Sequence, residues 1–325
     1  MAMQTYRPTV AVYGGANLDI QARCRASYRP GDSNPGTSSI AAGGVGRNIA
    51  ENLARMGLAT ELVTVFGDDE SASYIADGCR SAGVEVGRSL ILPGKETSRY
   101  VCVLDADGSL VGAVAAMDAI DSFGPAELAM RFGPGDEAEI VVVDANLPAE
   151  TIAMAAIRWK DKPLLLDSVS VAKAGKAAPV VGSFSIVKPN RHEARVLLGL
   201  HADDAGPGQS DPLESAMASA RALLGLGVRE AFVSLGPLGL LWACKDGMGL
   251  ARPLSMPVVS VSGAGDAATA ALAWSTVMEH DTATKASYAV AASSLCASCP
   301  DAVTTGMSAD RLAELVRGVI NERIS

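Results

Sequence analysis

The stretch VSGAGDA, residues 261–267, predicts a strand, a glycine turn and the start of a helix in direct succession. A β-branched run at positions 258, 259 and 261 leads into it, and a run of small and apolar residues follows at 267–278. Glycine permits a tight bend, and the unpaired amides of a first helical turn favour an anion. Asp266 would lie in that turn. Amides that stabilise a moving phosphate beside a carboxylate that accepts a proton suit phosphoryl transfer.

The same stretch has a simpler interpretation. A glycine-rich turn with Asp266 as a helix cap is common. Its spacing matches neither a Walker A loop nor the G-x-G-x-x-G dinucleotide fingerprint, and neither motif occurs elsewhere in the chain. Residues 261–267 alone therefore leave both interpretations open.

Composition and charge limit the class of protein. The 325 residues, 49% of them hydrophobic, can form a large α/β core with or without an appendage. A net charge of −9 disfavours nucleic acid or an anionic membrane as the main partner. The first residues show no signal-peptide pattern, and no apolar run approaches the roughly 20 residues that span a bilayer. We expect a cytoplasmic protein.

The cysteines and histidines do not indicate a metal site. Six cysteines are scattered along the chain, which is typical of reduced thiols. Cys296 and Cys299 form one isolated C-x-x-C, which we interpret as a buried helix end. The three histidines do not cluster, which argues against a zinc enzyme or a His-based triad.

Strands and helices alternate along most of the chain. This alternation predicts a central, mostly parallel sheet between two layers of helices, with ligands at the carboxyl ends of the strands. Expected strands are 9–14, 60–66, 139–144, 164–167, 184–188 and 230–235, followed by hairpin-like segments around 239–252. Expected helices are 45–56, 70–82, 149–159, 213–226, 265–279, 284–297 and 309–323.

A second, smaller β unit interrupts this alternation. Segments 100–104 and 110–114 flank a DADG turn, which is a hairpin signal. Residues 21–40 are polar and rich in turn residues, and we expect an irregular loop there. We interpret 15–40 and 88–117 as a β lid on a single domain, 1–325. Residues 202–212 predict a mobile surface loop.

Four further motifs each allow two interpretations. Gly43-Gly44 with Asn48 is either plain helix initiation or a close approach to a ligand. Asn17 and Asp19, on one face of an extended segment, form either a turn or a pair that binds hydroxyls.

The other two motifs lie further along the chain. Asn190 to Glu193 has capping-box spacing, or else holds Mg²⁺ through waters near a triphosphate. The turn SLGPLG, residues 234–239, is either a chain reversal or the wall of a nucleotide pocket.

Taken in this order, the motifs resemble those of the ribokinase-like, phosphofructokinase B-type carbohydrate kinases. Gly43-Gly44 with Asn48 resembles the N-terminal signature of that family. Residues 262–266 resemble its D-T-x-G-A-G-D signature, with Ser262 for the usual Thr, and Asn190-x-x-Glu193 resembles its N-x-x-E motif. The resemblance covers essentially the whole chain.

Within that family, several stretches resemble pseudouridine kinases more than ribokinases or fructokinases. They are 32–36, 43–53, Pro93-Gly94 with 97–100, and 188–191. Ala115-Ala116 departs from the subgroup, because some pseudouridine kinases carry Asn-Asp there. Substrate identity is therefore less constrained by the sequence than reaction type.

The resemblance implies an ATP- and Mg²⁺-dependent kinase that phosphorylates the 5′-hydroxyl of a ribosyl nucleoside, pseudouridine first. Asp266 would be the general base, and the amides of Gly263, Ala264 and Gly265 the anion hole. A monovalent cation such as K⁺ near 261–266 and a homodimer formed through the lid are further expectations.

The resemblance also implies the remaining contacts. The substrate would meet Asn17, Asp19, Gly43, Gly44 and Asn48. The lid residues Asp32, Ser33 and Thr97 would lie near the nucleobase of the substrate. ATP would meet Lys188, Asn190, Ser234, Gly236, Gly239 and the helix around Ala292 and Cys296. Metal and phosphates would be organised by Asn190, Glu193 and Asp167.

Three alternatives remain at this stage. The first is another sugar or nucleoside kinase of the same fold, such as a ribokinase or an adenosine or inosine kinase. The second is a catalytically silent sensor, although a sensor has no need of Asp266. The third is an α/β protein whose glycine turns are only structural.

Overall fold

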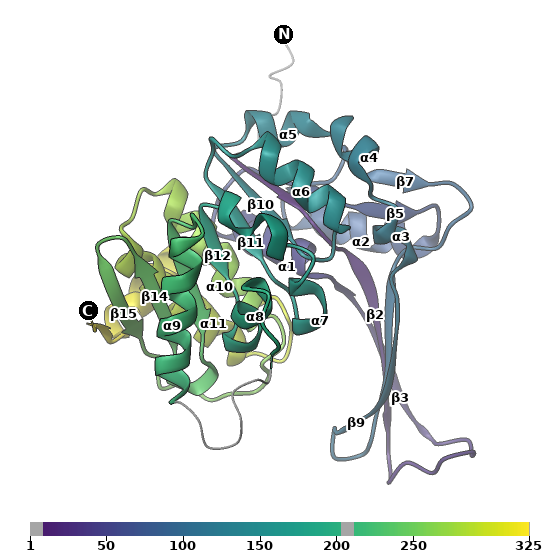
Figure 1. Cartoon of the computed structure of the whole chain (residues 1–325). Helices are drawn as coiled ribbons and strands as arrows, with labels where there is room; N and C mark the ends of the chain where they lie inside the picture. Colours follow the sequence, from purple (N-terminus) through teal and green to yellow (C-terminus); the bar gives the residue numbers. More distant parts are fainter. Residues whose placement is uncertain (1–8, 203–210, 325) are drawn as a thin grey trace.

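A twisted central sheet organises the chain (Figure 1). Within residues 9–202 and 211–324, which this computed structural model describes, ten strands join in the order β16-β15-β14-β13-β12-β11-β10-β1-β4-β6. The strands from β13 to β6 run parallel, and β14, β15 and β16 are antiparallel. Their bounds are β1 Val10–Tyr13, β4 Thr60–Val63, β6 Val84–Glu85, β10 Ile140–Asp144, β11 Leu164–Asp167, β12 Ile186–Lys188, β13 Glu230–Ser234, β14 Leu240–Cys244, β15 Gly247–Ala251 and β16 Asn321–Arg323.

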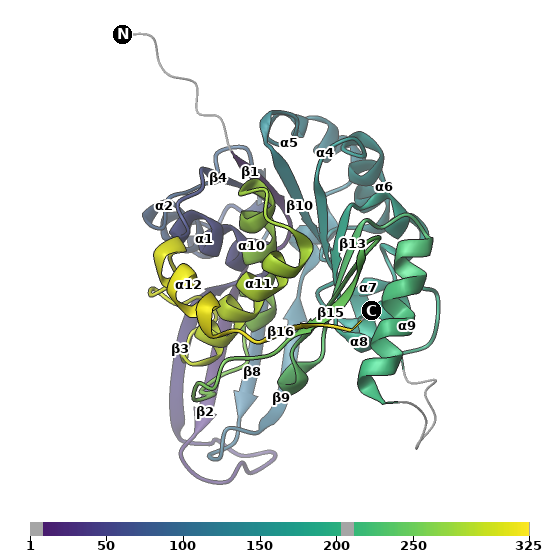
Figure 2. The same cartoon turned by 90° about the vertical axis from the view of Figure 1, so that its left-hand side faces the viewer.

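Helices cover both faces of this sheet (Figure 2). Successive side chains of a strand point to opposite faces, so Val10 and Val12 enter one buried cluster while Ala11 and Tyr13 enter the other. The first cluster packs against α1 Val45–Arg55, α2 Glu70–Ser81, α10 Ala264–Val277, α11 Thr282–Ala297 and α12 Ala309–Leu315. The second packs against residues of the segments α3 Asp118–Asp121, α4 Pro125–Ala129, α5 Phe132–Glu137, α6 Ala149–Arg158, α7 Val171–Ala174, η1 Ala178–Ser183, α8 Arg191–Leu197 and α9 Pro212–Gly225.

A separate four-stranded sheet projects from this body (Figure 1). Its order is β3-β2-β8-β9, with β2 Asn17–Cys24, β3 Gly36–Gly43, β8 Arg99–Leu104 and β9 Leu110–Ala116. β5 Val65–Gly67 and β7 Leu90–Leu92 form a third, two-stranded sheet. The predicted α/β class with a mostly parallel sheet and an added small sheet is confirmed.

The expected loop at 21–40 is wrong. β2 and β3 pair over their full length, from Asn17 opposite Gly43 to Cys24 opposite Gly36, and only 25–35 turns between them. Most of β3 is exposed and the middle of β2 is only partly buried, so neither strand carries the clear apolar alternation that marks a half-buried strand.

Two further expectations about secondary structure are also wrong. Residues 258–261 form no strand; instead, the amides of Val259 and Ser260 bond to the carbonyl of Ala297. The expected helix 309–323 ends at Leu315, followed by η3 Val316–Gly318 and β16. Asn321 there binds the indole of Trp242 on the sheet, at 2.8 Å, so pairing with β15 replaces the helix.

The expected mobile loop at 202–212 falls mainly on 203–210, which lie outside the described residues. In the part of the chain that the structure describes, no helix is long and apolar enough to cross a membrane.

One buried carboxylate makes the stability of the fold depend on pH. Glu61 on β4 is 2% exposed, and its Oε1 lies 3.4 Å from Nε of Arg88. Burial raises the pKa of Glu61 to about 7, and repulsion by Glu85 and Glu137 acts in the same direction. The folded protein therefore holds a proton that the unfolded chain loses near pH 4.5, so stability falls as pH rises from about 4.5 to about 7.

We predict that Glu61→Gln raises the free energy of unfolding at pH 8 by roughly 1–3 kcal/mol, because the cost of burying the charge is removed. At pH 4.5 the change should be much smaller. Denaturant titrations at both pH values measure the difference. Glu139→Gln, exposed just before β10 and not among the groups that shift the pKa of Glu61, is the matched control. Equal effects of Glu61→Gln at both pH values would contradict the assignment.

Candidate active site

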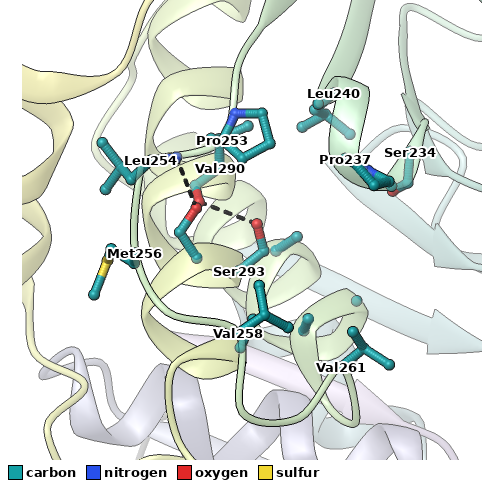
Figure 3. A pocket seen from close by; sticks show the side chains of 17 residues that line it. Ser234, Pro237, Leu240, Pro253, Leu254, Met256, Val258, Val261, Val290 and Ser293 are labelled. Atoms are coloured by element: carbon teal, nitrogen blue, oxygen red, sulfur yellow. Dashed lines mark hydrogen bonds between the residues drawn. The ribbon is translucent and has the colours of Figure 1, made fainter.

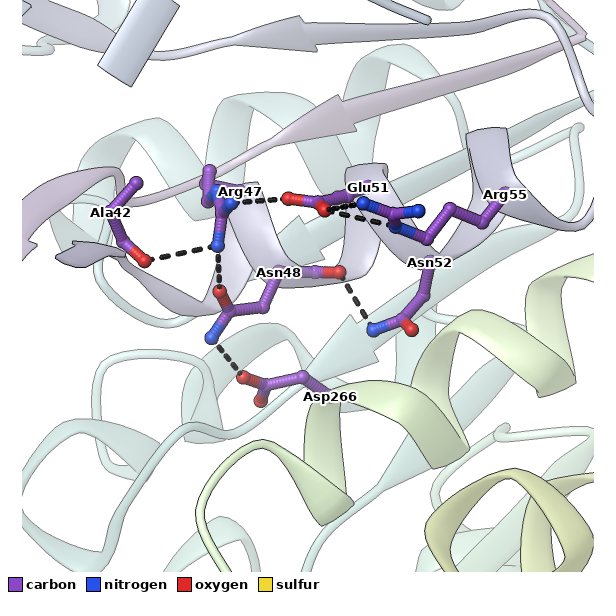
Figure 4. A network of polar contacts seen from close by, with 7 residues as sticks. All are labelled: Ala42, Arg47, Asn48, Glu51, Asn52, Arg55 and Asp266. Carbon is purple, nitrogen blue, oxygen red and sulfur yellow. Dashed lines mark hydrogen bonds and ion pairs between the residues drawn. The ribbon is translucent and has the colours of Figure 1, made fainter. Parts of the chain in front are cut away.

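The N-termini of α1 and α10 meet beside the carboxyl ends of the central strands. Asp266 lies in the first turn of α10, and its Oδ2 accepts a hydrogen bond of 2.8 Å from Nδ2 of Asn48 on α1 (Figure 4). Both helices start after a glycine with positive φ, 98° at Gly44 and 74° at Gly263. Neither has a side-chain cap, whereas α2, α8, α9, α11 and α12 have one. The segments α3, α4, α5, α6 and α7 also lack a side-chain cap. In α1 the amide of Arg47 bonds to the carbonyl of Gly15 at 3.1 Å, and in α10 the amide of Ala264 contacts the carbonyl of Val261 at 3.4 Å; the other first-turn amides are available to a ligand.

Gly263 is packed tightly in the turn before α10. A Cβ at this position would collide with the carbonyl oxygen of Ala302. From the other side, Sγ of Cys296 contacts the carbonyls of Ser262 and Ala302, at 3.6 and 3.3 Å. The turn that presents Ala264 and Gly265 is therefore held by the loop that follows α11.

The carboxylate of Asp266 has a shifted proton affinity. Burial raises its pKa to about 7, and repulsion by Asp167 and Asp144 adds to the rise. The hydrogen bond from Asn48 and the charge of Lys188 act in the opposite direction. A base with a pKa near the working pH suits proton abstraction.

A buried pair lies beside this carboxylate. Nζ of Lys188, at the end of β12, is 3.4 Å from Oδ2 of Asp167, at the end of β11. The carboxylate of Asp167 also accepts bonds from Thr269 Oγ1 at 2.5 Å and from the amide of Val169 at 2.8 Å. The negative charges of Asp167, Glu193 and Asp266 raise the pKa of Lys188 and keep it cationic.

A cavity of about 460 Å³ opens next to the turn (Figure 3). The predicted residues Ser234, Gly236 and Gly239 line it, and so do Ala264 and Gly265. The rest of the wall is largely apolar and includes Leu240, Pro253, Leu254, Met256, Val258, Val261, Ala268 and Val290. The 234–239 turn therefore lines a cavity, as the nucleotide-pocket interpretation requires, and the proposed anion hole forms part of the wall of the same cavity.

The two residues predicted on α11 do not face this cavity. Ala292 and Cys296 are fully buried and do not line the cavity; Val290, Ser293, Ser294 and Ala297 do. These four positions share one face of the helix, and the neighbouring face points into the core. Ser294 also accepts a bond from the amide of Leu254 in the cavity wall.

The predicted substrate-side residues come together where the small sheet joins the body. Nδ2 of Asn17 donates to Oδ1 of Asp19 at 2.6 Å. Asn17 pairs with Gly43, and the amide of Asn48 bonds to the carbonyl of Gly44. These five residues thus form one group connected to Asp266 through Asn48.

The three lid residues predicted to lie near the nucleobase are not part of this group. Asp32 and Ser33 are exposed in the turn at the far end of the β2–β3 arm (Figure 1). Thr97 is buried, where its hydroxyl donates to Asp69 at 2.6 Å and accepts from the amide of Gly67. In this conformation the hydroxyl of Thr97, two residues before β8, is taken up by Asp69, the N-cap of α2, and by the amide of Gly67.

The predicted metal residues are already occupied by protein groups. Asn190 and Glu193 form the capping box of α8, and Oε2 of Glu193 also accepts a bond from Ser168 at 2.7 Å. Among the described residues there is no group of three or more His, Cys, Asp or Glu that could hold a metal ion. Mg²⁺ commonly keeps its waters and binds substrate phosphates, and that mode requires no such cluster. These residues fit a role through water better than direct ligation.

Three residues near Asp266 received no role from the sequence. Asp144, noted only as a strand end, is buried and accepts bonds from the amides of Gly15 and Asn146. Thr269 lies one helical turn after Gly265, on the face of α10 that carries Asp266. Arg47 adjoins Asn48 in sequence, and adjacency to a predicted site residue was the available signal.

Comparison with known proteins agrees with this geometry. The family model of the pfkB family carbohydrate kinases matches residues 7–309. The chain belongs to the pfkB family of carbohydrate kinases. It is 31% identical to the pseudouridine kinase of Escherichia coli strain K12 over 291 residues, which is 89% of this chain and 90% of that protein.

Solved structures share the fold of this pfkB kinase. A carbohydrate kinase from Agrobacterium tumefaciens has a TM-score of 0.81 and 27% identity, covering 97% of this chain and 99% of its own. The ribokinase of Arabidopsis thaliana, solved with ribose and ATP, has a TM-score of 0.82 and 23% identity, covering 96% and 99%. The chain is thus a ribokinase-like member of this family, whose kinases are phosphotransferases with an alcohol acceptor and use ATP. The alternative of an α/β protein outside the kinases is therefore wrong.

We predict that Gly263→Ala lowers kcat about 100-fold or more, because the added methyl displaces the amides of the turn from the phosphate. Steady-state kinetics with the preferred substrate measure it. Gly57→Ala is the matched control: it also places a side chain at positive φ, 89°, but no atom lies within 4 Å of the new Cβ. A Gly263→Ala enzyme as active as Gly57→Ala would contradict the assigned anion hole.

Proposed function

We propose that this kinase transfers the terminal phosphoryl group of Mg·ATP to the 5′-hydroxyl of pseudouridine. The observation that carries the proposed chemistry is the hydrogen-bonded pair of Asn48 and Asp266 beside the turn that lines the cavity. It combines a proton acceptor, open backbone amides and room for a nucleotide at one point.

Each group in the site then has a defined task. Asp266 accepts the proton of the attacking hydroxyl. The amides of Gly263, Ala264 and Gly265 stabilise negative charge on the transferring phosphate, and Lys188, close to Gly265, adds a buried positive charge. Asn17 and Asp19 hold the hydroxyls of the ribose, and Asn48 contacts both substrate and base.

ATP occupies the apolar cavity in this proposal, with its adenine against the Val290 and Ser293 face of α11 and near the 234–239 turn. Bound with ATP, Mg²⁺ neutralises phosphate charge; Asn190 and Glu193 contact its waters, and Asp167 acts on the phosphates through Lys188. A monovalent cation near 261–266 remains a prediction.

Support for pseudouridine comes from sequence stretches and relatives. Residues 32–36, 43–53 and 97–100 resemble those of pseudouridine kinases, and the similarity to the E. coli pseudouridine kinase extends over most of the chain. Ala115 and Ala116 on β9 depart from that pattern. A ribose or other nucleoside kinase, or a silent sensor, is the competing outcome of the experiment below.

The experiment is a substrate panel. We expect Mg·ATP-dependent formation of pseudouridine 5′-phosphate with kcat/KM at least 10-fold above that for ribose, uridine or adenosine, followed by mass spectrometry or labelled ATP. Equal or better turnover of another member of the panel would replace pseudouridine as the substrate. No turnover of any member, with ATP still bound, would favour the sensor.

Asp266→Asn is the control for the chemistry. It should bind ATP as the wild type does but lose at least 1,000-fold in kcat, because an amide cannot accept the proton. In the wild type, kcat/KM should fall as pH drops below about 7, since protonated Asp266 is no base. An Asp266→Asn enzyme with near-normal turnover would refute the assigned base.

We also propose that a second copy of the chain covers the small sheet. Ile20, Ile40, Val101 and Val114 stand directly opposite one another across its four strands and so share one face. The last three are exposed, and strand alternation puts Asn17 and Asp19 on the other face. A row of β-branched side chains of this kind favours sheet-to-sheet packing.

We predict that the wild type sediments as a dimer at micromolar concentration and that Val114→Glu shifts it to the monomer. The charge would have to be buried without a partner in the packed face. Ser39→Glu, exposed on β3 but on the opposite face of the same small sheet, is the control. A wild type that is still monomeric at about 100 μM would contradict the proposal, because even a weak specific dimer forms at that concentration.

A further inference from the structure

Arg47 lies at the third position of α1, next to Asn48, and its side chain is only 11% exposed. Figure 4 shows it between the end of β3, the amide of Asn48 and the carboxylate of Glu51. Its Nη1 donates to the carbonyl of Ala42 at 3.0 Å and to Oδ1 of Asn48 at 2.9 Å. The guanidinium does not touch Asp266, so any effect on that carboxylate passes through Asn48.

The chemistry of the guanidinium decides how the amide of Asn48 is turned. Arginine has only donors, so the atom of Asn48 that faces it must be the carbonyl oxygen Oδ1. The NH₂ group then faces Asp266, at 2.8 Å from Oδ2. A flipped amide would set NH₂ against the guanidinium and an oxygen against the carboxylate. Both contacts would be repulsive, so Arg47 selects the orientation that gives Asp266 a donor.

The guanidinium is itself anchored. Its Nη2 pairs with Oε2 of Glu51, one turn along α1, and Glu51 is 5% exposed. Oε1 of Glu51 accepts two bonds from Arg55, at 2.9 and 2.7 Å. Two arginines therefore neutralise one buried carboxylate, and only one of them touches Asn48. Arg55 is in consequence a built-in control for the effect of the ion pairs alone.

We propose that Arg47 is a positioning residue that locks the amide of Asn48, and through it the carboxylate of Asp266, to the end of β3. The proposal rests on the proposed function in taking Asp266 as the base. The contact with Ala42 means that the junction of the small sheet with the body and the orientation of the base are held by one guanidinium.

The orientation of the Asn48 amide affects the proton affinity of Asp266. The groups that act on Asp266 come from four packed elements: Asp144 on β10, Asp167 on β11, Lys188 on β12 and Asn48 on α1. Cys296 of α11 also lies within its field. Only Asn48 and Lys188 lower the pKa of Asp266. If the amide turns over, one of these two influences is lost, and the carboxylate keeps its proton to higher pH.

The test compares Arg47→Met, Arg47→Lys and Arg55→Met. We expect Arg47→Met to lose at least 10-fold in kcat with the KM for ATP within 3-fold of the wild type, as an effect on orientation rather than on nucleotide binding. The acid limb of its pH–rate profile should move upward by about half a pH unit or more. Arg47→Lys should recover most of kcat, because an ammonium can still donate to Oδ1. Arg55→Met should keep the wild-type profile.

A double-mutant cycle completes the test. If Arg47 acts through Asn48, then Arg47→Met should add less than 2-fold to the loss caused by Asn48→Ala. Additive losses in the cycle, or equal effects of Arg47→Met and Arg55→Met with an unmoved acid limb, would overturn the proposal. If Arg47→Met does not fold, Arg47→Gln takes its place with the same expected shift. Failure of the proposed function would show differently, as near-normal turnover in Asp266→Asn.

Discussion

The hydrogen bond from Asn48 to Asp266 joins two helix N-termini that lie 218 positions apart in the chain. Both helices begin at a glycine with positive φ and without a side-chain cap. The amide of Arg47 bonds to the carbonyl of Gly15 and that of Ala264 makes a long contact with Val261, so only the remaining first-turn amides are free to meet a ligand. In the helices α2, α8, α9, α11 and α12 an Asp, Asn or Ser at the N-cap accepts those bonds. Because α3, α4, α5, α6 and α7 also lack a side-chain cap, the feature that distinguishes α1 and α10 is the glycine with positive φ at the start of each, together with the contact between Asn48 and Asp266.

The electrostatics of the site follow from the parallel sheet. Adjacent parallel strands end at one edge, and here β10, β11 and β12 end in Asp144, Asp167 and Lys188. With Asp266 above them, three carboxylates share one buried cation and a few amide and hydroxyl donors. Such a group cannot hold every negative charge at its ordinary proton affinity, and burial raises the pKa of both Asp144 and Asp266. Asp144 is fully buried, whereas Asp266 is partly exposed. That carboxylate is the one best placed to exchange a proton with a bound alcohol.

Several features were predictable because they depend on local chemistry. The 234–239 turn and the 263–265 turn follow from glycine, and the capping box of α8 follows from Asn190 and Glu193 at their spacing. The strands β1, β4, β10, β11, β12 and β13 were recognisable because each is a short, mostly buried apolar run, whereas the polar β16 and the two-residue β6 were not. By contrast, the sequence did not reveal β2 and β3, because the projecting arm that they form carries no clear apolar alternation. It also wrongly indicated a strand at 258–261, because Val258 and Val261 line a cavity instead of a sheet.

The amino-acid sequence by itself determined the alternation of elements, the open glycine turns and the identity of the carboxylate in the second of them, because backbone freedom and hydrophobic periodicity are properties of neighbouring residues. Only the tertiary structure decided which face of α11 meets the cavity and that the hydroxyl of Thr97 is bonded to Asp69, the N-cap of α2. It also decided that an arginine turns the amide beside the base. Those outcomes depend on which atoms of segments distant in the sequence come into contact, and the pattern of neighbouring residues does not specify such contacts.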